Sequence, residues 1–215
     1  MYVEDARNTS FNYIDTQYLT YDANNRVTAL TSTQGKEVYT YVSNTKFTLD
    51  LYLSGTLSIH ELFFVNSNSL VDSTRQDDQV GDTSTEAYLY YGKQLSRKTT
   101  YDYSTATGSQ IYMQEDYTYD SNGNLVKDIQ SDGNGNVSMV TTYTYTSYPF
   151  VNLLSPIYLP IQSKNLPATM TQKDGSGVLI GSISYSYVFD SSNRLIKETD
   201  LSNNSETVIK TYLYY

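Results

Sequence analysis

Polar and β-forming residues alternate along most of the chain. The segment 46–53 is the clearest case, since its odd positions are apolar while Thr48, Asp50 and Tyr52 carry polar groups. A period of two places residues i and i+2 on the same face of a strand. No segment combines a convincing 3.6-residue apolar period with helix caps. The pattern therefore predicts an all-β chain with little helix.

A turn motif recurs between these alternating segments. Its best copies are Tyr21–Val27, Tyr119–Leu125 and Phe189–Leu195, and weaker copies begin at Phe64, at Tyr91 and near residue 162. Each good copy reads aromatic, Asp, two small or polar residues, Asn or Gly, Arg or Asn, then aliphatic. The Asp can accept a hydrogen bond from the backbone two residues on, and Asn and Gly tolerate positive φ. The motif is therefore interpreted as a β-hairpin turn.

Sequential hairpins make an antiparallel β-meander, and these repeats predict about 12 strands of roughly 5–10 residues each. Open sheets beyond about ten strands tend to curl, split or close. We therefore expect residues 1–215 to form a single β-meander domain, curled into a half-open or nearly closed barrel. All four prolines fall within 148–167, where the repeat lapses. This segment is predicted to be an insertion whose apolar residues 151–161 plug the sheet, with a partner-binding lip as the alternative.

The repeated motif resembles the tyrosine-aspartate (YD, or Rhs-type) repeat, whose consensus is roughly Tyr-x-Tyr-Asp-x-x-Gly-Arg-Leu. The match is clearest at Tyr117–Leu125 and Tyr185–Leu195 and weaker at Tyr18–Val27. The chain also resembles repeat-bearing secreted lipoproteins of unknown function from Gram-negative bacteria. That resemblance implies a porin-like or partly open β-meander. It also implies export to the periplasm or cell surface, with any signal or lipid anchor lying outside this sequence.

Composition and charge narrow the function classes. The 215 residues include 24 Tyr, one His and no Cys or Trp, and 14 basic against 23 acidic residues give a net charge of −9. Nucleic-acid binding depends on clusters of Lys and Arg, and this sequence contains no such cluster. A catalytic triad or a thiol mechanism is essentially excluded. We expect no cofactor and a monomer. An outer-membrane barrel is also considered, and it is disfavoured because many outward-facing positions are Thr, Ser or Asp.

Three stretches of the sequence carry acidic residues that are candidates for a cation site, namely the series from Asp120, the series from Asp132 and the segment 72–86. Asp120-x-Asn122-x-Asn124 has the alternating oxygen ligands of a calcium loop, and a similar series begins at Asp132. Hairpin chemistry already explains both series, and neither continues with the Gly and Glu that a calcium loop requires, so we interpret them as turns. The acidic segment 72–86 is interpreted as a solvated loop.

Tyrosine pairs form the candidate ligand-binding surface. Each pair occupies one face of a strand, and neighbouring hairpins would align the rings into a ladder. The rings either line the concave interior as core, or offer a stacking platform for a glycan, an extended polymer or a surface protein. We favour a non-catalytic structural or binding module. A glycoside hydrolase using two carboxylates is the alternative. The candidate residues are Tyr117, Tyr119, Tyr143, Tyr145, Tyr185, Tyr187, Tyr212 and Tyr214.

Overall fold

The computed structural model describes residues 2–8, 13–78, 83–104, 108–150, 163–204 and 206–214, and side chains within 17–76, 84–102, 108–150, 163–204 and 206–212. These residues form strands and turns, with no helix among them. No membrane-crossing helix is therefore found in the described ranges.

The described residues form sixteen strands, joined mostly by short turns. They are β1 (Tyr2–Asn8), β2 (Tyr13–Tyr21), β3 (Val27–Thr31), β4 (Gly35–Ser43), β5 (Lys46–Leu53), β6 (Thr56–Val65), β7 (Val71–Asp78), β8 (Thr83–Tyr91), β9 (Gln94–Ser104), β10 (Gly108–Tyr119), β11 (Leu125–Asp132), β12 (Val137–Pro149), β13 (Asn165–Asp174), β14 (Leu179–Phe189), β15 (Leu195–Ser202) and β16 (Thr207–Tyr214).

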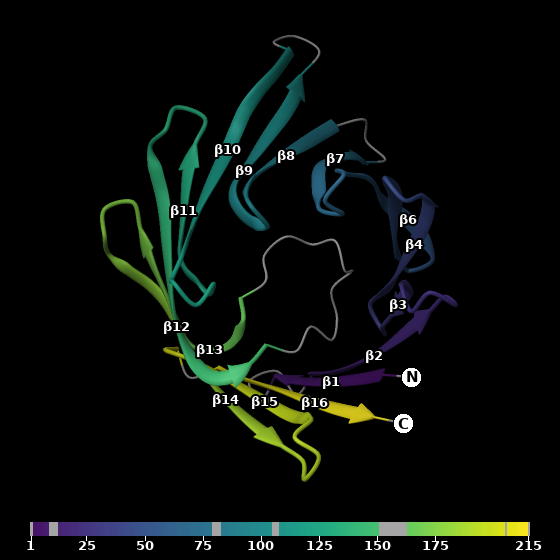
Figure 1. Cartoon of the computed structure of the whole chain (residues 1–215), viewed down its shortest axis with the longest axis vertical. Helices are drawn as coiled ribbons and strands as arrows, with labels where there is room; N and C mark the ends of the chain where they lie inside the picture. Colours follow the sequence, from purple (N-terminus) through teal and green to yellow (C-terminus); the bar gives the residue numbers. More distant parts are fainter. Residues whose placement is uncertain are drawn as a thin grey trace.

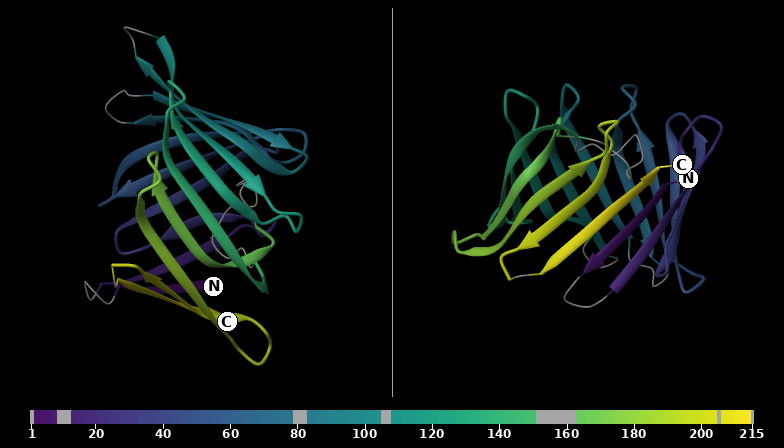
Figure 2. Two further views of the ribbon diagram at one scale, coloured as in Figure 1. Left: turned by 90° about the vertical axis from the view of Figure 1, so that its left-hand side faces the viewer. Right: turned by 90° about the horizontal axis from the view of Figure 1, so that it is seen from below.

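Every strand pairs antiparallel with its sequence neighbours, and the two terminal strands pair with each other. β1 contacts β2 on one side and β16 on the other, with Tyr2 opposite Tyr214 and Asn8 opposite Val208. The sheet is therefore a closed barrel in which strand order equals chain order. The strands form a ring in Figure 1, and Figure 2 shows the N- and C-terminal strands lying side by side.

The β-hairpin turn predicted from the Asp motif is confirmed at the three best copies of that motif. In the turn after β10, the amide of Gly123 donates to the Asp120 carbonyl at 3.0 Å. The Asp120 carboxylate accepts from the amides of Asn122 at 2.9 Å and Asn124 at 2.8 Å. Gly123 has φ 87°, a value that glycine adopts without strain. The same arrangement recurs at Asp22, Asp132, Asp174 and Asp190.

The apolar core lies on the inner face of the barrel. Phe47 of β5 and Phe63 of β6 are cross-strand partners, and their rings stack at 4.4 Å with an interplanar angle of 8°. The predicted alternation in 46–53 holds at this point, because Phe47 is buried while Thr48 and Asp50 share the opposite face with His60. The aliphatic residues that follow the turns, namely Val27, Val71, Leu95, Leu125 and Leu195, are buried as well.

The all-β meander predicted from the sequence is confirmed, although the described residues form sixteen strands rather than about 12, and the barrel is closed rather than half-open or nearly closed. The predicted solvated loop at 72–86 is wrong, because β7 and β8 occupy most of it. The backbone groups of these two strands pair with β6 and β9, whatever the polarity of the side chains. Thr74 of β7 is even buried, with 1% of its surface exposed.

The predicted insertion at 148–167 is only partly described. β12 extends through Pro149, and β13 already includes Asn165 and Pro167, so both ends of the segment belong to strands. Residues 151–162, on which the predicted plug depends, lie outside the described residues.

Candidate functional site

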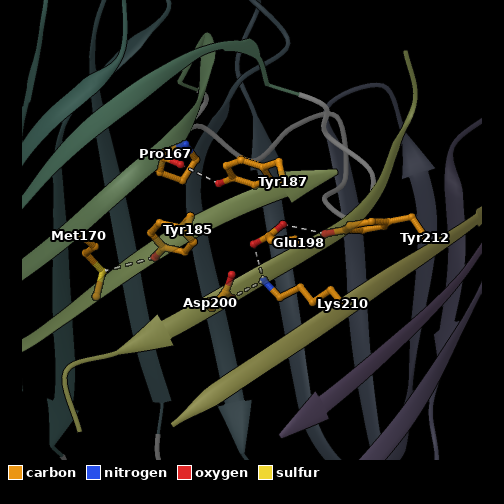
Figure 3. Close-up of polar contacts among 8 residues, drawn as sticks. All are labelled: Pro167, Met170, Tyr185, Tyr187, Glu198, Asp200, Lys210 and Tyr212. Atoms are coloured by element: carbon orange, nitrogen blue, oxygen red, sulfur yellow. Dashed lines mark hydrogen bonds and ion pairs between the residues drawn. The ribbon is translucent and has the colours of Figure 1, made fainter. Parts of the chain in front are cut away.

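The predicted tyrosines lie on the inner wall of the barrel. Tyr117 and Tyr119 come from β10, and the other pairs come from β12, β14 and β16. Figure 3 shows Tyr185, Tyr187 and Tyr212 on this wall, beside charged residues of β15 and β16. The structure therefore brings most of the predicted set onto one face. Tyr214 lies in β16, and its side chain falls outside the described residues.

One group of these tyrosines is hydrogen-bonded to carboxylates of the wall. The Tyr117 hydroxyl donates to Glu115 Oε2 at 2.5 Å, and the Tyr212 hydroxyl donates to Glu198 Oε2 at 2.8 Å. Burial first, and then the bond to Glu115, raise the pKa of Tyr117 far above its ordinary value. The same contact with a Glu two residues earlier recurs at Tyr39 and Tyr88. Because the same contact recurs in several strands, we interpret it as a structural feature of the barrel.

A second group caps backbone carbonyls of the neighbouring strand. The Tyr145 hydroxyl donates to the Leu125 carbonyl at 2.5 Å, and the Tyr187 hydroxyl donates to the Pro167 carbonyl at 2.8 Å. Both acceptors lie near the start of the preceding strand, where ladder pairing begins. Tyr41 and Tyr90 make the same bond to Val27 and Val71. In the pairs of β12 and β14, the second tyrosine thus connects its hairpin to the start of the preceding strand.

Three candidate tyrosines remain without a strong acceptor. The Tyr119 hydroxyl is buried with no partner in the described residues. Tyr185 reaches only the weakly accepting Met170 sulfur at 4.0 Å, and the hydroxyl of Tyr143 makes no hydrogen bond within the described side chains. Burial raises the pKa of Tyr119 and of Tyr143 to about 12, so both hydroxyls stay protonated at neutral pH. The hydroxyls of these three tyrosines are thus not used by the wall, although the rings of Tyr119 and Tyr143 pack against the cluster of Leu95, Tyr117 and Leu125.

Two lysines bridge carboxylates on the same wall. Lys98 Nζ lies 2.8 Å from Glu115 Oε1 and 3.3 Å from a Glu86 oxygen. Lys210 Nζ lies 2.9 Å from Glu198 Oε1 and 3.1 Å from Asp200 Oδ2. Each lysine faces two acids, so each cluster keeps an excess of negative charge. The sequence patterns did not identify these clusters, because their members come from different strands.

Asp128 is an acid of the inner wall that forms no ion pair with a described residue. In the strand register, Asp128 of β11 lies opposite Tyr117 of β10 and opposite Thr141 of β12. Its Oδ1 is buried without a hydrogen-bond partner in the part of the chain that the structure describes. Burial first, and then the neighbouring charge of Glu115, raise its pKa to about 6. Asp200 has a pKa raised to about 6 in the same way.

Replacing Asp128 by Asn is expected to stabilise the protein at pH 7.5. The folded-state pKa lies above the ordinary 3.8, so the ionised form opposes folding above about pH 6, and this cost disappears as the pH falls toward 4. We expect a gain of about 1 kcal/mol after allowing for solvent screening. Urea unfolding at pH 7.5 and at pH 4.5 measures it, with the exposed Asp72→Asn as control. An equal effect at both pH values would contradict the assignment.

The outer wall carries polar contacts between neighbouring strands. Arg97 and Asp116 form an exposed two-bond ion pair between β9 and β10, at 2.6 and 3.0 Å. His60 Nδ1 lies 2.5 Å from Asp50 Oδ1, and the hydroxyls of Thr144 and Thr169 hydrogen-bond across β12 and β13. The outer face therefore presents charges and hydroxyls beside exposed apolar side chains such as Leu89 and Phe64, and the single histidine contacts a carboxylate there.

The two calcium-like series are turns in the structure. The carboxylate oxygens of Asp120 and Asp132 accept backbone and side-chain N–H groups from residues two to four positions later. Hydrogen bonds from these groups hold the pKa of both acids below their ordinary value. In the side chains that the structure describes, no three His, Cys, Asp or Glu residues gather as a metal site.

Sequence reasoning missed a pocket of about 500 Å³ between the β3–β4 and β5–β6 turns. Lys36 and Tyr52, cross-strand partners in β4 and β5, both line it. The position of Tyr52 opposite the apolar face of 46–53 was the available signal. Pairing of Tyr52 with a lysine could not be read before the strand register was known.

Comparison with known proteins shows the fold. No family model matches the chain, and no curated protein matches its sequence. A porin-like protein from Bacteroides uniformis ATCC 8492 superposes with a TM-score of 0.70 at 14% identity, over 99% of this chain and 95% of that chain. A porin-like protein from Bacteroides vulgatus ATCC 8482 gives 0.69 at 13% identity, over 99% and 98%. The chain therefore shares its fold with porin-like proteins of Bacteroides.

Proposed function

We propose that this chain is a non-catalytic binding module, built from YD-like hairpin repeats, that holds a glycan against the tyrosines of its inner wall. The observation that carries the proposal is the division among those tyrosines. Several hydroxyls are bound to the wall's own oxygens, while Tyr119, Tyr143 and Tyr185 have no strong acceptor. Sugars bind to surfaces that combine flat aromatic faces with polar groups, and these rings lie on the same wall as Asp128.

The location proposed for this module is the periplasm or the cell surface, without insertion into a bilayer. Exposed charges such as Arg97 and Asp116 on the outer face support a wall in contact with water, since a charge on the lipid-facing side of a membrane barrel costs about 2–4 kcal/mol at the midplane. Likeness to porin-like proteins of Bacteroides supports a bacterial envelope setting. Purification as a monodisperse protein without detergent is the expected result, and dependence on detergent would contradict it.

Binding to a panel of neutral oligosaccharides tests the proposed ligand class. We expect at least one hexasaccharide among the gluco-, xylo- and manno-series to bind, and Tyr143→Ala and Tyr185→Ala each to weaken that binding at least tenfold, equivalent to about 1.4 kcal/mol. Tyr91→Ala is the matched control, because Tyr91 is 84% exposed on β8 and does not belong to the candidate surface. Isothermal titration calorimetry on each variant gives the affinities.

Loss of binding must be separated from loss of folding. Tyr143→Leu keeps apolar volume and removes the flat ring and the hydroxyl, so it should fold and still fail to bind. Circular dichroism and thermal unfolding of each variant establish the folded state. Absence of binding to the whole panel by folded wild-type protein would overturn the glycan proposal, and so would wild-type affinity in folded Tyr143→Leu.

A glycoside hydrolase is the second candidate, because Asp128 combines a raised pKa with a neighbouring carboxylate, Glu115. Hydrolysis needs one protonated and one ionised carboxyl group, and environments that separate two pKa values create such a pair. Glu115, however, is engaged by Lys98 and Tyr117, and it lies beside Asp128 on the same wall. We expect no release of reducing sugars from the panel. Release that is lost in folded Asp128→Asn would favour the hydrolase instead.

A further inference from the structure

The outer rim of the barrel carries a second site, which is separate from the inner tyrosines. It is the pocket of about 500 Å³ formed where the β3–β4 turn meets the β5–β6 turn, a size typical of small-molecule sites of about 300–1,000 Å³. The pocket is lined by Thr31, Ser32, Thr33, Gln34, Lys36 and Tyr52, among others. One cation, one aromatic ring, an amide and several hydroxyls therefore surround one space.

The polar groups of this pocket are only partly used by the protein itself. Ser32 is fully engaged, since its hydroxyl oxygen accepts from the amides of Gln34 at 3.1 Å and Gly35 at 3.3 Å. In contrast, Lys36 forms no ion pair, and the side chains of Gln34 and Tyr52 make no hydrogen bond, with any described residue. Three different functional groups remain available to a ligand at the same place.

Lys36 has no acidic partner although the chain as a whole is acidic. Acidic residues exceed basic ones by nine, and Lys36, like Lys127 and Lys173, forms no ion pair with a described residue. Lys36 shares the outward face with Thr31 and Tyr52, its partners in β3 and β5, and neither is acidic. An ammonium group without a counter-charge, at the edge of a pocket, favours a ligand that brings its own negative charge.

Backbone geometry keeps the pocket in shape. The amide of Ser32 donates to the Gly35 carbonyl at 2.8 Å, which closes the β3–β4 turn. Gly35 packs so closely on β5 that a Cβ atom there would lie 2.6 Å from the Tyr52 carbonyl oxygen. The β5–β6 turn is also tight, with φ 50° at Ser54 and φ 80° at Gly55. The site is thus largely formed before a ligand arrives, which reduces the entropic cost of binding.

We propose that this rim pocket binds a carboxylated sugar residue, with the sugar's apolar face on Tyr52, its carboxylate at Lys36 and its hydroxyls at Gln34 and Thr31. A neutral sugar would leave the lysine unused, and a bare anion would leave the ring unused. A carboxylated sugar is the ligand class that uses both. This site does not depend on the inner-wall proposal.

Calorimetric titration with trigalacturonate tests the assignment, and its methyl ester provides a ligand of the same shape without the charge. We expect trigalacturonate to bind with a dissociation constant below about 1 mM, and the ester to bind at least tenfold more weakly. Lys36→Gln and Tyr52→Leu should each weaken binding at least tenfold, while Lys36→Arg retains most of it. Lys127→Gln, which changes a lysine of β11 outside the pocket, should leave the affinity unchanged.

Several outcomes would overturn the proposal. These are no binding of trigalacturonate by folded wild-type protein, equal binding of the ester, or complete competition by an equal concentration of inorganic sulfate, which would indicate a simple anion site. The inner-wall proposal is tested independently. Tyr143→Leu should leave trigalacturonate binding intact, and Lys36→Gln should leave neutral oligosaccharide binding intact, so failure of either proposal is recognised separately.

Discussion

Replacing Phe47 by alanine is expected to lower the free energy of unfolding by about 3–5 kcal/mol. The Phe47 side chain is 1% exposed and stacks on Phe63 from the next strand, so removing it loses buried apolar area and leaves a cavity on the inner wall. Rigid cross-strand pairing limits how far the wall can collapse into that space. Urea denaturation at neutral pH, followed by circular dichroism, measures the change.

Phe64→Ala is the matched control for this substitution. Phe64 is adjacent to Phe63 in β6, yet it is 38% exposed and lies on the opposite face of the strand. Its removal should cost about 1 kcal/mol or less. A loss from Phe64→Ala equal to that from Phe47→Ala would show that the inner apolar cluster does not dominate the stability of this region.

Gly133→Ala is expected to have an effect of similar size for a different reason. A Cβ atom at Gly133 would lie 2.0 Å from the carbonyl oxygen of Ile111 in β10, so the backbone of the β11–β12 turn must move away from the neighbouring strand. Moving a turn together with its pairing costs more than a change of rotamer, and we expect a loss of about 2–4 kcal/mol. Gly175→Ala should behave alike, with 1.9 Å to the Val137 carbonyl oxygen.

Ser121→Ala provides the control for the glycine substitutions. Ser121 occupies the corresponding position after Asp120, in a turn at the opposite end of the barrel, and it is exposed. A nearly unchanged melting temperature in Ser121→Ala, beside a large decrease in Gly133→Ala, would assign the effect to the close approach of the turn to the neighbouring strand. Equal melting temperatures in the two variants would contradict that explanation.

Local chemistry made the turns predictable from the sequence. The residues Asp120, Gly123 and Leu125 each have a role that a single hairpin defines: acceptor of backbone amides, positive φ, and first buried residue of the next strand. The inner face of 46–53 was predictable for the same reason, since alternation alone identifies it.

Features that depend on two or more strands were not predictable. Whether the sheet closes depends on the register of β1 with β16, and no local pattern encodes a contact between the two ends of a chain. The segment 72–86 was misread because its polarity suggested solvent, whereas the inner wall of this barrel itself accommodates polar and charged groups. The rim pocket was missed because Lys36 and Tyr52 become neighbours only through the pairing of β4 with β5.

Pairing of the first strand with the last has a consequence for how the molecule forms. Until β16 docks, the growing sheet has two free edges, and unpaired edges promote association with other chains. The contact that removes both edges spans almost the whole chain and is therefore the slowest type to form. The interval between synthesis of β1 and arrival of β16 is accordingly when this tyrosine-rich chain is most exposed to aggregation, and the completed ring ends that exposure in one step.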